Sequence, residues 1–298
     1  MSAARTLVTG ASGFIGRALV RRLVAEGAEV HAAARTPPPD SSDGAHWHAV
    51  DLADEAAARA LVQSVGAARI IHLASLVSGR RDLELVLPAL RANLLSTVHL
   101  LVAAHSVGVE RIVLAGSMEE PLPGEAPSSP YAAAKAAASS YARMFHALYA
   151  LPVVTARLFM VYGPGQRDLS KLVPASILAA LAGERPRIAS GARPVDWIYV
   201  DDVVDGLCTL VAASGIEGSV LDLGSGELAT VRDVVEAICR QCGVDGPEVG
   251  ALPDRTHETV RRADAEATYA ACGFRSRVAL AEGLARTIEA VRGARVSG

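Results

Sequence analysis

The chain has few cysteines and few aromatic residues, and it lacks a strong excess of charge of either sign. Its four cysteines are Cys208, Cys239, Cys242 and Cys272, and the pair Cys239 and Cys242 has no second pair or nearby histidines to complete a zinc site. A net charge of -3 provides no overall attraction to nucleic acid or to an anionic membrane. We therefore expect no metal, no nucleic acid and no membrane as partners, and a small molecule as the ligand.

The N-terminus lacks the features of a targeting segment. Residues 1–5 lead directly into a strand-like run, without a charged leader, a long apolar stretch or a small-residue cleavage site. We therefore expect a cytoplasmic protein. With 298 residues and a hydrophobic content of 51%, the chain is able to bury the core of one large domain, or of one domain with a smaller companion.

The first half of the chain alternates short β-branched runs with longer segments rich in Ala and Leu. This alternation predicts an α/β fold, a Rossmann doubly wound parallel sheet with helices on both faces. Strands are expected at residues 6–9, 29–34, 69–74, 111–115 and 153–158, and helices at 14–26, 53–65, 84–107 and 131–150.

The second half differs, because Pro and Gly become frequent between Gly163 and Gly191. We place a dinucleotide-binding Rossmann domain at residues 1–163 and a smaller C-terminal α/β substrate lobe mainly at 164–298, with some segments returning to the main domain. In the second region we expect strands at 197–200 and 220–223 and helices at 231–239 and 280–291.

A glycine-rich segment follows the first expected strand. Residues 9–16 read Thr-Gly-Ala-Ser-Gly-Phe-Ile-Gly and open an amphipathic helix. Glycines allow backbone N–H groups to approach a pyrophosphate, which the positive end of the helix dipole also attracts. A purely structural turn is the alternative, but strand, turn, helix and next strand follow in the order that dinucleotide binding requires. The expected cofactor ligands here are Gly10, Ser12, Gly13, Phe14, Ile15 and Gly16.

The end of the second expected strand bears on the type of dinucleotide. A carboxylate there would bind the ribose of NAD(H) and repel a 2′-phosphate, but residues 32–35 read Ala-Ala-Ala-Arg. Arg35 is able to pair with a 2′-phosphate, so we expect NADP(H) in preference to NAD(H). A solvated loop arginine is the alternative. Asp51 and Leu52 are expected to contact the adenine.

Tyr131 and Lys135 lie one helical turn apart on one face of an expected helix. A free phenol has a pKa of about 10, so it needs a neighbouring cation to exchange protons near neutral pH. Lys135 is one of only two lysines, the other being Lys171, among 29 basic residues. We therefore predict that Tyr131 is the acid/base group and that Lys135, together with the positive ring of an oxidised nicotinamide, brings its pKa closer to the working range.

Two further polar residues fit this chemistry. Ser117 follows an apolar strand, where its hydroxyl would orient the reacting oxygen toward Tyr131. Asn93 lies within a long expected helix and would hold a water that relays protons to Lys135. The alternatives are a cap or turn residue for the serine and a solvent-facing side chain for the asparagine.

These residues together resemble the extended short-chain dehydrogenase/reductase family, which includes nucleotide-sugar epimerases, dehydratases and keto-sugar reductases. The resemblance covers nearly the whole chain. Residues 9–16 resemble the cofactor loop, residues 157–165 the substrate loop, and residues 196–202 and 221–226 two later landmarks. It implies that Asn93, Ser117, Tyr131 and Lys135 are catalytic, and that Arg255 binds nucleotide phosphates. We further expect Leu73 and Ala74 to contact the cofactor, and Ser75 and Met118 to contact the substrate.

Two departures from the family pattern concern the substrate. Met160 stands where the family commonly has asparagine and Val195 where it has arginine, and neither side chain supplies the hydrogen bonds that grip a nucleotide diphosphate. Arg193 or Arg167 would compensate. A nucleotide-linked sugar is the expected substrate, and one that is not a nucleotide sugar is the alternative.

The loop after Ser117 is shorter than in typical epimerases, which resembles the keto-sugar reductases. Glu119 occupies the position where dehydratases of the family keep a base, while Met118 replaces their acid; a solvated loop charge is the alternative for Glu119. We therefore expect an NADPH-dependent reductase of a keto-sugar, of the 4-ketoreductase type. The alternatives are an epimerase or dehydratase that recycles a tightly bound NAD(P), and a non-catalytic dinucleotide sensor. A homodimer through the two long mid-chain helices is implied by the resemblance.

Overall fold

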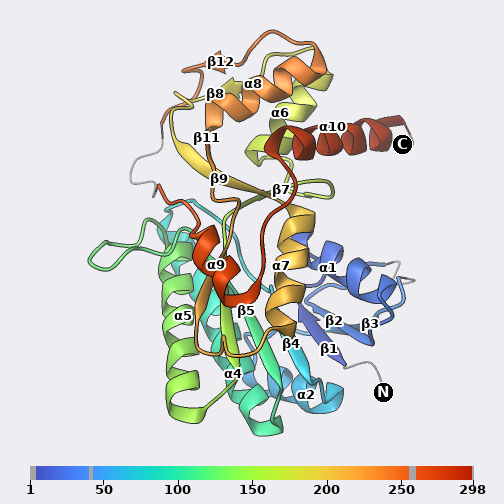
Figure 1. Cartoon of the computed structure of the whole chain (residues 1–298), viewed down its shortest axis with the longest axis vertical. Helices are drawn as coiled ribbons and strands as arrows, with labels where there is room; N and C mark the ends of the chain where they lie inside the picture. Colours follow the sequence, from blue (N-terminus) through green and yellow to red (C-terminus); the bar gives the residue numbers. More distant parts are fainter. Residues whose placement is uncertain (1–4, 40–42, 255–259, 297–298) are drawn as a thin grey trace.

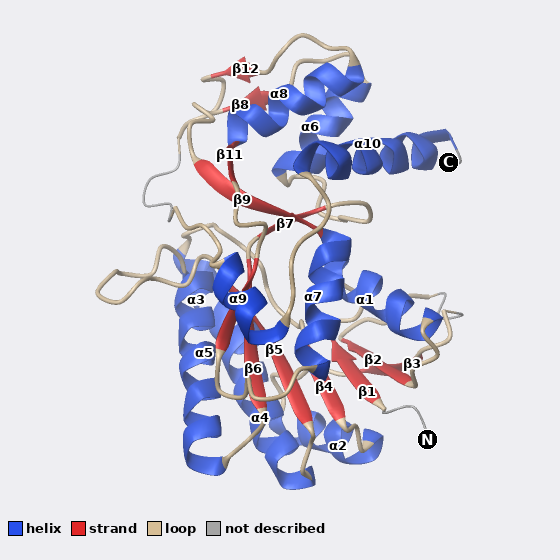
Figure 2. Ribbon diagram, viewed as in Figure 1, coloured by secondary structure: helices blue, strands red, loops and turns tan. Residues whose placement is uncertain are grey.

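The computed structural model describes residues 5–39, 43–254 and 260–296. Its main sheet has seven parallel strands in the order β10-β6-β5-β4-β1-β2-β3, so that the strand order reverses between β1 and β4 (Figures 1 and 2). This arrangement confirms the predicted doubly wound α/β fold. The strands are β1 (Thr6–Thr9), β2 (Val30–Ala34), β3 (His46–Ala49), β4 (Arg69–His72), β5 (Arg111–Ser117), β6 (Val153–Leu158) and β10 (Val220–Leu223).

Helices cover both faces of this sheet. One face packs against α1 (Phe14–Ala25) and α7 (Val200–Ala212), with Leu19 and Leu207 fully buried in that layer. The other face packs against α2 (Glu55–Val65), α4 (Ser96–Val107) and α5 (Pro130–Tyr149). Burying each large aliphatic side chain in these layers contributes about 1.5–3 kcal/mol. The continuous apolar strands follow from this two-sided burial.

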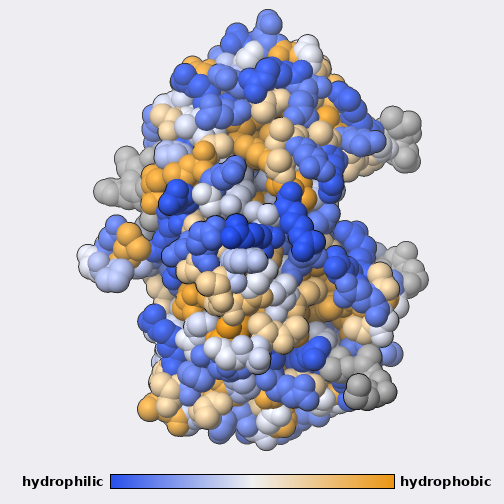
Figure 3. Space-filling view, viewed as in Figure 1, coloured by the Kyte–Doolittle hydropathy of each residue, from blue (hydrophilic) through white to orange (hydrophobic). Residues whose placement is uncertain are grey.

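A smaller set of elements lies beyond the carboxyl ends of the sheet strands (Figure 1). A three-stranded sheet packs with three helices around its own apolar cluster, and a two-stranded sheet packs beside one of these helices, α8 (Val231–Cys242), through a small separate cluster. Hydrophobic side chains gather above the waist between this part and the main sheet (Figure 3). The elements are β7 (Met160–Tyr162), α6 (Leu172–Leu181), β8 (Arg187–Ile188), β9 (Pro194–Tyr199), β11 (Leu228–Thr230), α8 (Val231–Cys242), β12 (Glu248–Val249) and α10 (Leu280–Val296), while α9 (Ala265–Cys272) packs beside β10.

A buried carboxylate connects distant segments of the chain at this junction. Asp196 on β9 is fully buried, and its oxygens accept hydrogen bonds from the backbone N–H groups of Ser225, Gly226 and Ala263 at 2.7–2.9 Å. The hydroxyl of Ser225 donates to it as well, at 2.8 Å. Because a buried charge is costly unless it is fully hydrogen-bonded, these contacts fix β9 against the loops after β10 and before α9.

The segment expected as one helix at 84–107 is helical but irregular. A 3₁₀ turn (Leu83–Leu85), the short helix α3 (Val86–Ala89) and a π-helical turn (Leu90–Leu95) precede α4. By length and composition alone the run Leu83–Val107 is apolar enough to cross a membrane, and a third of its most apolar window is buried. Within the protein, α4 packs against α2 and α5, as core helices of similar composition do.

Candidate active site

The glycine-rich loop between β1 and α1 leaves no room for side chains at two of its glycines. Gly10 has φ +67°, and a Cβ there would lie 2.5 Å from the backbone of Leu73 and Ala74 at the end of β4. A Cβ on Gly16 would lie 2.3 Å from the carbonyl oxygen of Gly10. The glycines therefore let three backbone segments meet at the point where the strand order reverses, which is where doubly wound folds bind dinucleotides.

The N-terminus of α1 is open for a phosphate. Gly13 is the N-cap and supplies no side-chain hydrogen bond to the first turn. Among the other predicted loop residues, Ser12 is half-buried, while Phe14 and Ile15 pack partly into the apolar clusters on either side. This geometry fits a pyrophosphate, because the first-turn N–H groups and the helix dipole together favour an anion.

The residues predicted near the adenosine lie after β2 and β3. Arg35 directly follows β2 and is exposed. Asp51 is exposed and accepts a hydrogen bond from the backbone N–H of Ala53 at 3.0 Å. Leu52 is buried in the core, and its carbonyl oxygen is 3.1 Å from Nδ1 of His99. Arg35 and Asp51 are thus accessible to a ligand, whereas the side chain of Leu52 belongs to the packing beneath it.

Asn93 lies in the π-helical turn and is fully buried. Its Oδ1 accepts hydrogen bonds from the hydroxyl of Ser75 and the backbone N–H of Leu76, both at 2.8 Å. Its Nδ2 donates to the carbonyl oxygen of Leu76 at 3.1 Å. The side chain therefore fixes the loop after β4, a contact that the sequence did not suggest, and the predicted water relay to Lys135 stays a prediction.

His72, at the end of β4, is a buried residue that sequence reasoning missed. Its Nδ1 lies 2.7 Å from the hydroxyl of Thr9, and its Nε2 lies 3.1 Å from the hydroxyl of Thr97. Since the Thr97 hydroxyl donates to the carbonyl oxygen of Asn93 at 2.8 Å, it accepts from Nε2, and the hydroxyl of Thr9 donates to Nδ1. Burial, with a contribution from Lys135, lowers the pKa of His72 to about 3. A neutral imidazole thus connects the phosphate loop to the turn that carries Asn93.

Three of the four predicted catalytic residues meet at the end of β5 and the start of α5. Ser117 is near enough to Tyr131 for its side chain to lower the pKa of the phenol. The ammonium of Lys135 lies 6.0 Å from the centre of the Tyr131 ring and donates to the carbonyl oxygen of Ala115 at 2.8 Å. Helix α5 begins just before them, because Ser129 caps it through the N–H of Ala132 and Pro130 occupies its first turn.

Burial dominates the electrostatics of this pair. It raises the pKa of Tyr131, against the lowering by Ser117, and the nearby carboxylates of Glu119 and Glu120 raise it further. Burial lowers the pKa of Lys135 to about 8, while Glu120 opposes the fall. In the protein without a cofactor, desolvation therefore dominates the pKa of the phenol, and the prediction that Lys135 and an oxidised nicotinamide together bring this pKa toward neutrality stays a prediction.

The three residues after Ser117 have different surroundings. Met118 is 3% exposed and belongs to the apolar core of the main sheet. Glu119 is half-buried, and its backbone N–H donates to the Ser117 hydroxyl at 3.2 Å. Glu120, which sequence reasoning missed, is buried, and its Oε1 accepts from the backbone N–H of Ser117 at 2.7 Å. Substrate contact by Met118 and a catalytic role of Glu119 stay predictions.

Three of the residues predicted to bind substrate, or to compensate in its binding, lie on the side of the smaller lobe. Met160 begins β7 and is half-buried, opposite Trp197 of β9. Arg167 lies on an exposed loop, and Arg193 is half-buried just before β9. Val195 is 1% exposed, within β9. Arg255 lies outside the described residues.

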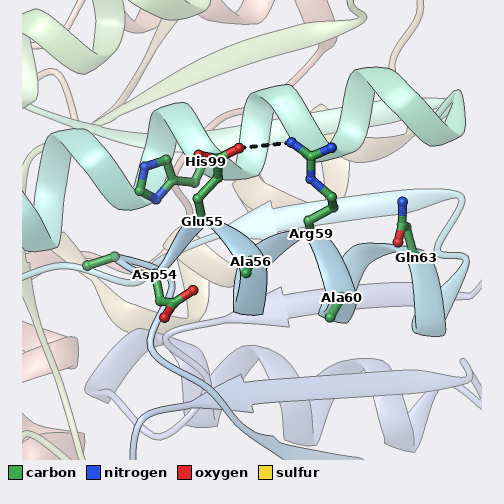
Figure 4. Close-up of a pocket in the computed structure, with 8 residues that line it drawn as sticks. Asp54, Glu55, Ala56, Arg59, Ala60, Gln63 and His99 are labelled. Carbon is green, nitrogen blue, oxygen red and sulfur yellow. Dashed lines mark hydrogen bonds and ion pairs between the residues drawn. The ribbon is translucent and has the colours of Figure 1, made fainter.

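Two surface hollows lie away from this cluster. One, of about 700 Å³, is lined by α2 and by His99 of α4, with Glu55 and Arg59 paired along the helix (Figure 4). Its polar groups already serve the fold, since Asp54 caps α2 and His99 contacts the carbonyl oxygen of Leu52. The other, of about 350 Å³, lies between α7 and the segment after α9. Neither contains a residue of the predicted site.

Comparison with known proteins agrees with this geometry. The model of the NAD dependent epimerase/dehydratase family matches residues 6–224. A UDP-glucose 4-epimerase of Mycolicibacterium smegmatis is 33% identical, over 97% of this chain and 98% of its own length. A dTDP-glucose 4,6-dehydratase of Streptomyces griseus is 31% identical, over 95% and 92%. Among solved structures, MoeE5 in complex with UDP-glucuronic acid and NAD is 32% identical, with a TM-score of 0.88 over 97% of this chain and 99% of that one. This chain belongs to the NAD-dependent epimerase/dehydratase family of nucleotide-sugar enzymes, within the extended short-chain dehydrogenases/reductases.

Proposed function

We propose that the chain is a nucleotide-sugar 4-epimerase that keeps its nicotinamide dinucleotide bound through the catalytic cycle. The observation that carries this proposal is the joint placement of Ser117, Tyr131 and Lys135 beside a residue, Met118, that is buried in the core. A dehydratase of this family needs an acid at the position of Met118, and a buried thioether is unable to donate a proton. The relatives favour the alternative of an epimerase or dehydratase over the reductase that the sequence suggested, and Met118 favours the epimerase within that alternative.

The protein residues have distinct tasks in such a reaction. Ser117 orients a sugar hydroxyl, Tyr131 removes its proton, and the ammonium of Lys135 stabilises the resulting phenolate. A bound NAD(P) supplies the hydride acceptor and, later, the hydride donor. After the keto-sugar has rotated within the site and has taken back the hydride, Tyr131 returns the proton to the oxygen. The loop formed around Gly10 and Gly16 would hold the cofactor through backbone N–H groups, as their close approach to neighbouring backbone supports.

Incubation of the cofactor-loaded enzyme with UDP-glucose, UDP-glucuronic acid and dTDP-glucose tests this function. We expect conversion of one of them to its 4-epimer, observed by chromatography, without net change in NADH absorbance. Loss of water from the sugar would instead indicate a dehydratase. Stoichiometric consumption of NADPH with a keto-sugar would indicate the reductase, which the short loop after Ser117 favours.

The preference for NADP(H) over NAD(H) is a separate part of the proposal and depends on Arg35. Its exposed position directly after β2 supports contact with a 2′-phosphate. MoeE5, in contrast, was solved with NAD. Calorimetric titration of the cofactor-free protein with NAD and NADP decides between the two.

We also propose a cytoplasmic homodimer. Apolar side chains are exposed along α4 and α5, among them Val102 at 40%, Tyr141 at 41% and Leu148 at 67%. A second copy that packs these helices together would remove this surface from water. Light scattering of the purified protein is expected to give twice the chain mass, and Leu148→Glu is expected to lower it.

A further inference from the structure

The buried carboxylate of Glu120 closes a tight turn around the serine of the site. Its side chain accepts a hydrogen bond from the backbone N–H of Ser117 at 2.7 Å. Its own backbone N–H donates to the carbonyl oxygen of Ser117 at 3.1 Å. Both backbone groups of Ser117 are therefore held by one residue, and the direction of the serine side chain depends on Glu120. At 6% exposure, the carboxylate has little contact with water.

Gly116 makes the space that this carboxylate occupies. A Cβ at Gly116 would lie 2.7 Å from Oε1 of Glu120 and 2.8 Å from Cγ2 of Thr155. The backbone of Gly116 continues β5 in register with Arg157, so an L side chain would fit its conformation but not its surroundings. A glycine within a strand weakens the strand, so a specific reason for it is expected. Here the reason is room for a charged side chain.

Ionisable side chains from α5 and from the segment before α9 surround Glu120. Lys135 of α5 donates to the carbonyl oxygen of Ala115, two residues before the Ser117 N–H from which Glu120 accepts, so the ammonium and the carboxylate contact the same stretch of β5. The carboxylate acts to raise the pKa of Lys135, of Tyr131 and of Arg261, which lies before α9. Lys135 is 3% exposed, and the acceptor of its hydrogen bond is the neutral carbonyl oxygen of Ala115. A buried ammonium needs a negative charge nearby to stay protonated, and burial here lowers its pKa to about 8, while Glu120 opposes that fall. The neighbouring His72, on β4, acts on this pair only as a neutral ring.

We propose that Glu120 is a positioning residue of the active site, which fixes Ser117 through its backbone and keeps Lys135 charged beside Tyr131. Glu119, its neighbour in sequence, interacts electrostatically with Tyr131 and is half-buried. The two adjacent glutamates thus have separate tasks. The inference rests on the proposed site but does not depend on the identity of the sugar.

The chain offers a direct test, because Lys135 and Lys171 are its only lysines. Protein labelled with ¹³C-lysine gives two Cε resonances, whose shifts report each ammonium as the pH is raised. Glu120→Gln keeps the shape and the acceptor oxygen but removes the charge. We expect Lys135 to lose its proton at lower pH in this variant than in the parent, while the resonance of Lys171, which pairs with Asp168 on the surface, is the internal reference. Titrations of Lys135 that coincide in parent and variant would overturn the proposal.

Two further variants make the test specific. Glu119→Gln removes an adjacent charge and is expected to leave the titration of Lys135 unchanged; a shift as large as that of Glu120→Gln would contradict the role of Glu120. Gly116→Ala displaces the carboxylate with a methyl group and is expected to shift Lys135 in the same direction as Glu120→Gln. Gly116→Ala replaces Glu120→Gln in the test if Glu120→Gln does not fold. A titration of Lys135 in Gly116→Ala that matches the parent would then refute the proposal. Since no substrate is used, these results are independent of the epimerase assay.

Discussion

The glycine-rich loop between β1 and α1 and the turn after β5 lie at the same edge of the sheet, but their glycines have opposite purposes. At Gly10, a Cβ would meet backbone atoms of Leu73 and Ala74, so the glycine brings backbone to backbone. At Gly116, a Cβ would meet the side chains of Glu120 and Thr155, so the glycine makes room for a charge. In our proposals, the first place binds the dinucleotide through N–H groups, and the second sets the protonation of Lys135 beside Tyr131. A change of shape should therefore damage the first, and a change of charge the second.

The largest effect is expected at Gly10. In Gly10→Ala, a positive φ and contacts at 2.5 Å with backbone atoms both oppose the new Cβ. We expect a loss of on the order of 3 kcal/mol in unfolding free energy and no detectable dinucleotide binding. Urea unfolding and calorimetry measure the two. Gly27→Ala is the matched control, since Gly27 has φ +78° with nothing within 4 Å, and it is expected to lose about 1 kcal/mol and to bind normally. Equal losses in both variants would show that strain alone, and not close approach, matters at Gly10.

A change of a single atom at Tyr131 tests the charge side of the comparison. Tyr131→Phe keeps the buried ring and removes the hydroxyl whose pKa Ser117 lowers. We expect turnover to fall by about a hundredfold or more, because a positioned acid/base group is lost. Dinucleotide affinity, measured by calorimetry, is expected to stay at the parent value. Undiminished turnover would remove Tyr131 from the catalytic role.

The buried, charged side chain of Lys135 is expected to lower the free energy of unfolding. Its pKa is about 8 in the folded protein against 10.5 when unfolded, so below pH 8 the folded state carries a penalty of about 3 kcal/mol. Between pH 8 and 10.5 the unfolded state binds more protons, and the stability of the parent therefore rises with pH. Lys135→Met removes the penalty but leaves the carbonyl of Ala115 without its donor, at a cost of about 1 kcal/mol.

Urea unfolding at pH 7 and pH 10 checks this balance. We expect Lys135→Met to be more stable than the parent by about 2 kcal/mol at pH 7. The difference should shrink at pH 10, where the parent lysine is largely neutral in the folded state. Lys171→Met is the matched control and should show no such change, since Lys171 is on the surface. A difference that is the same at both pH values would contradict the buried-charge interpretation.

The bounds of several strands could be predicted from the sequence, whereas irregular turns could not. The strands Thr6–Thr9 and Val220–Leu223 have the predicted bounds, because an apolar run with a polar residue before it and a glycine after it marks each one. Val153–Leu158 also has its predicted bounds, and Pro152 marks its start. The irregular turn around Asn93 was missed, since a π-helical turn has no signature in hydrophobic periodicity.

Glu120 was missed for a different physical reason. It follows Glu119 directly and precedes a proline-rich loop, where no periodicity indicates which side chain turns inward. Only the folded chain shows that Glu120 reaches back to the N–H of Ser117 while Glu119 is half-buried. The sequence contains no signal for His72 either, because its partners Thr9 and Thr97 are distant in sequence and meet its ring only in the folded chain.

The smallest effect is expected at Arg35, where dinucleotide binding would also depend on the charge of a side chain. Because Arg35 is exposed directly after β2, its contact with a 2′-phosphate would be partly screened by water. Arg35→Asp is therefore expected to move the ratio of NADP to NAD affinity toward NAD by about tenfold, with little change in unfolding free energy. Arg17→Asp, on the first turns of α1, is the control for a general loss of positive charge near the loop. If Arg35→Asp and the parent discriminate equally between the two dinucleotides, the residue after β2 does not contact the 2′ position. Cofactor binding then depends on the backbone N–H groups of the glycine-rich loop alone.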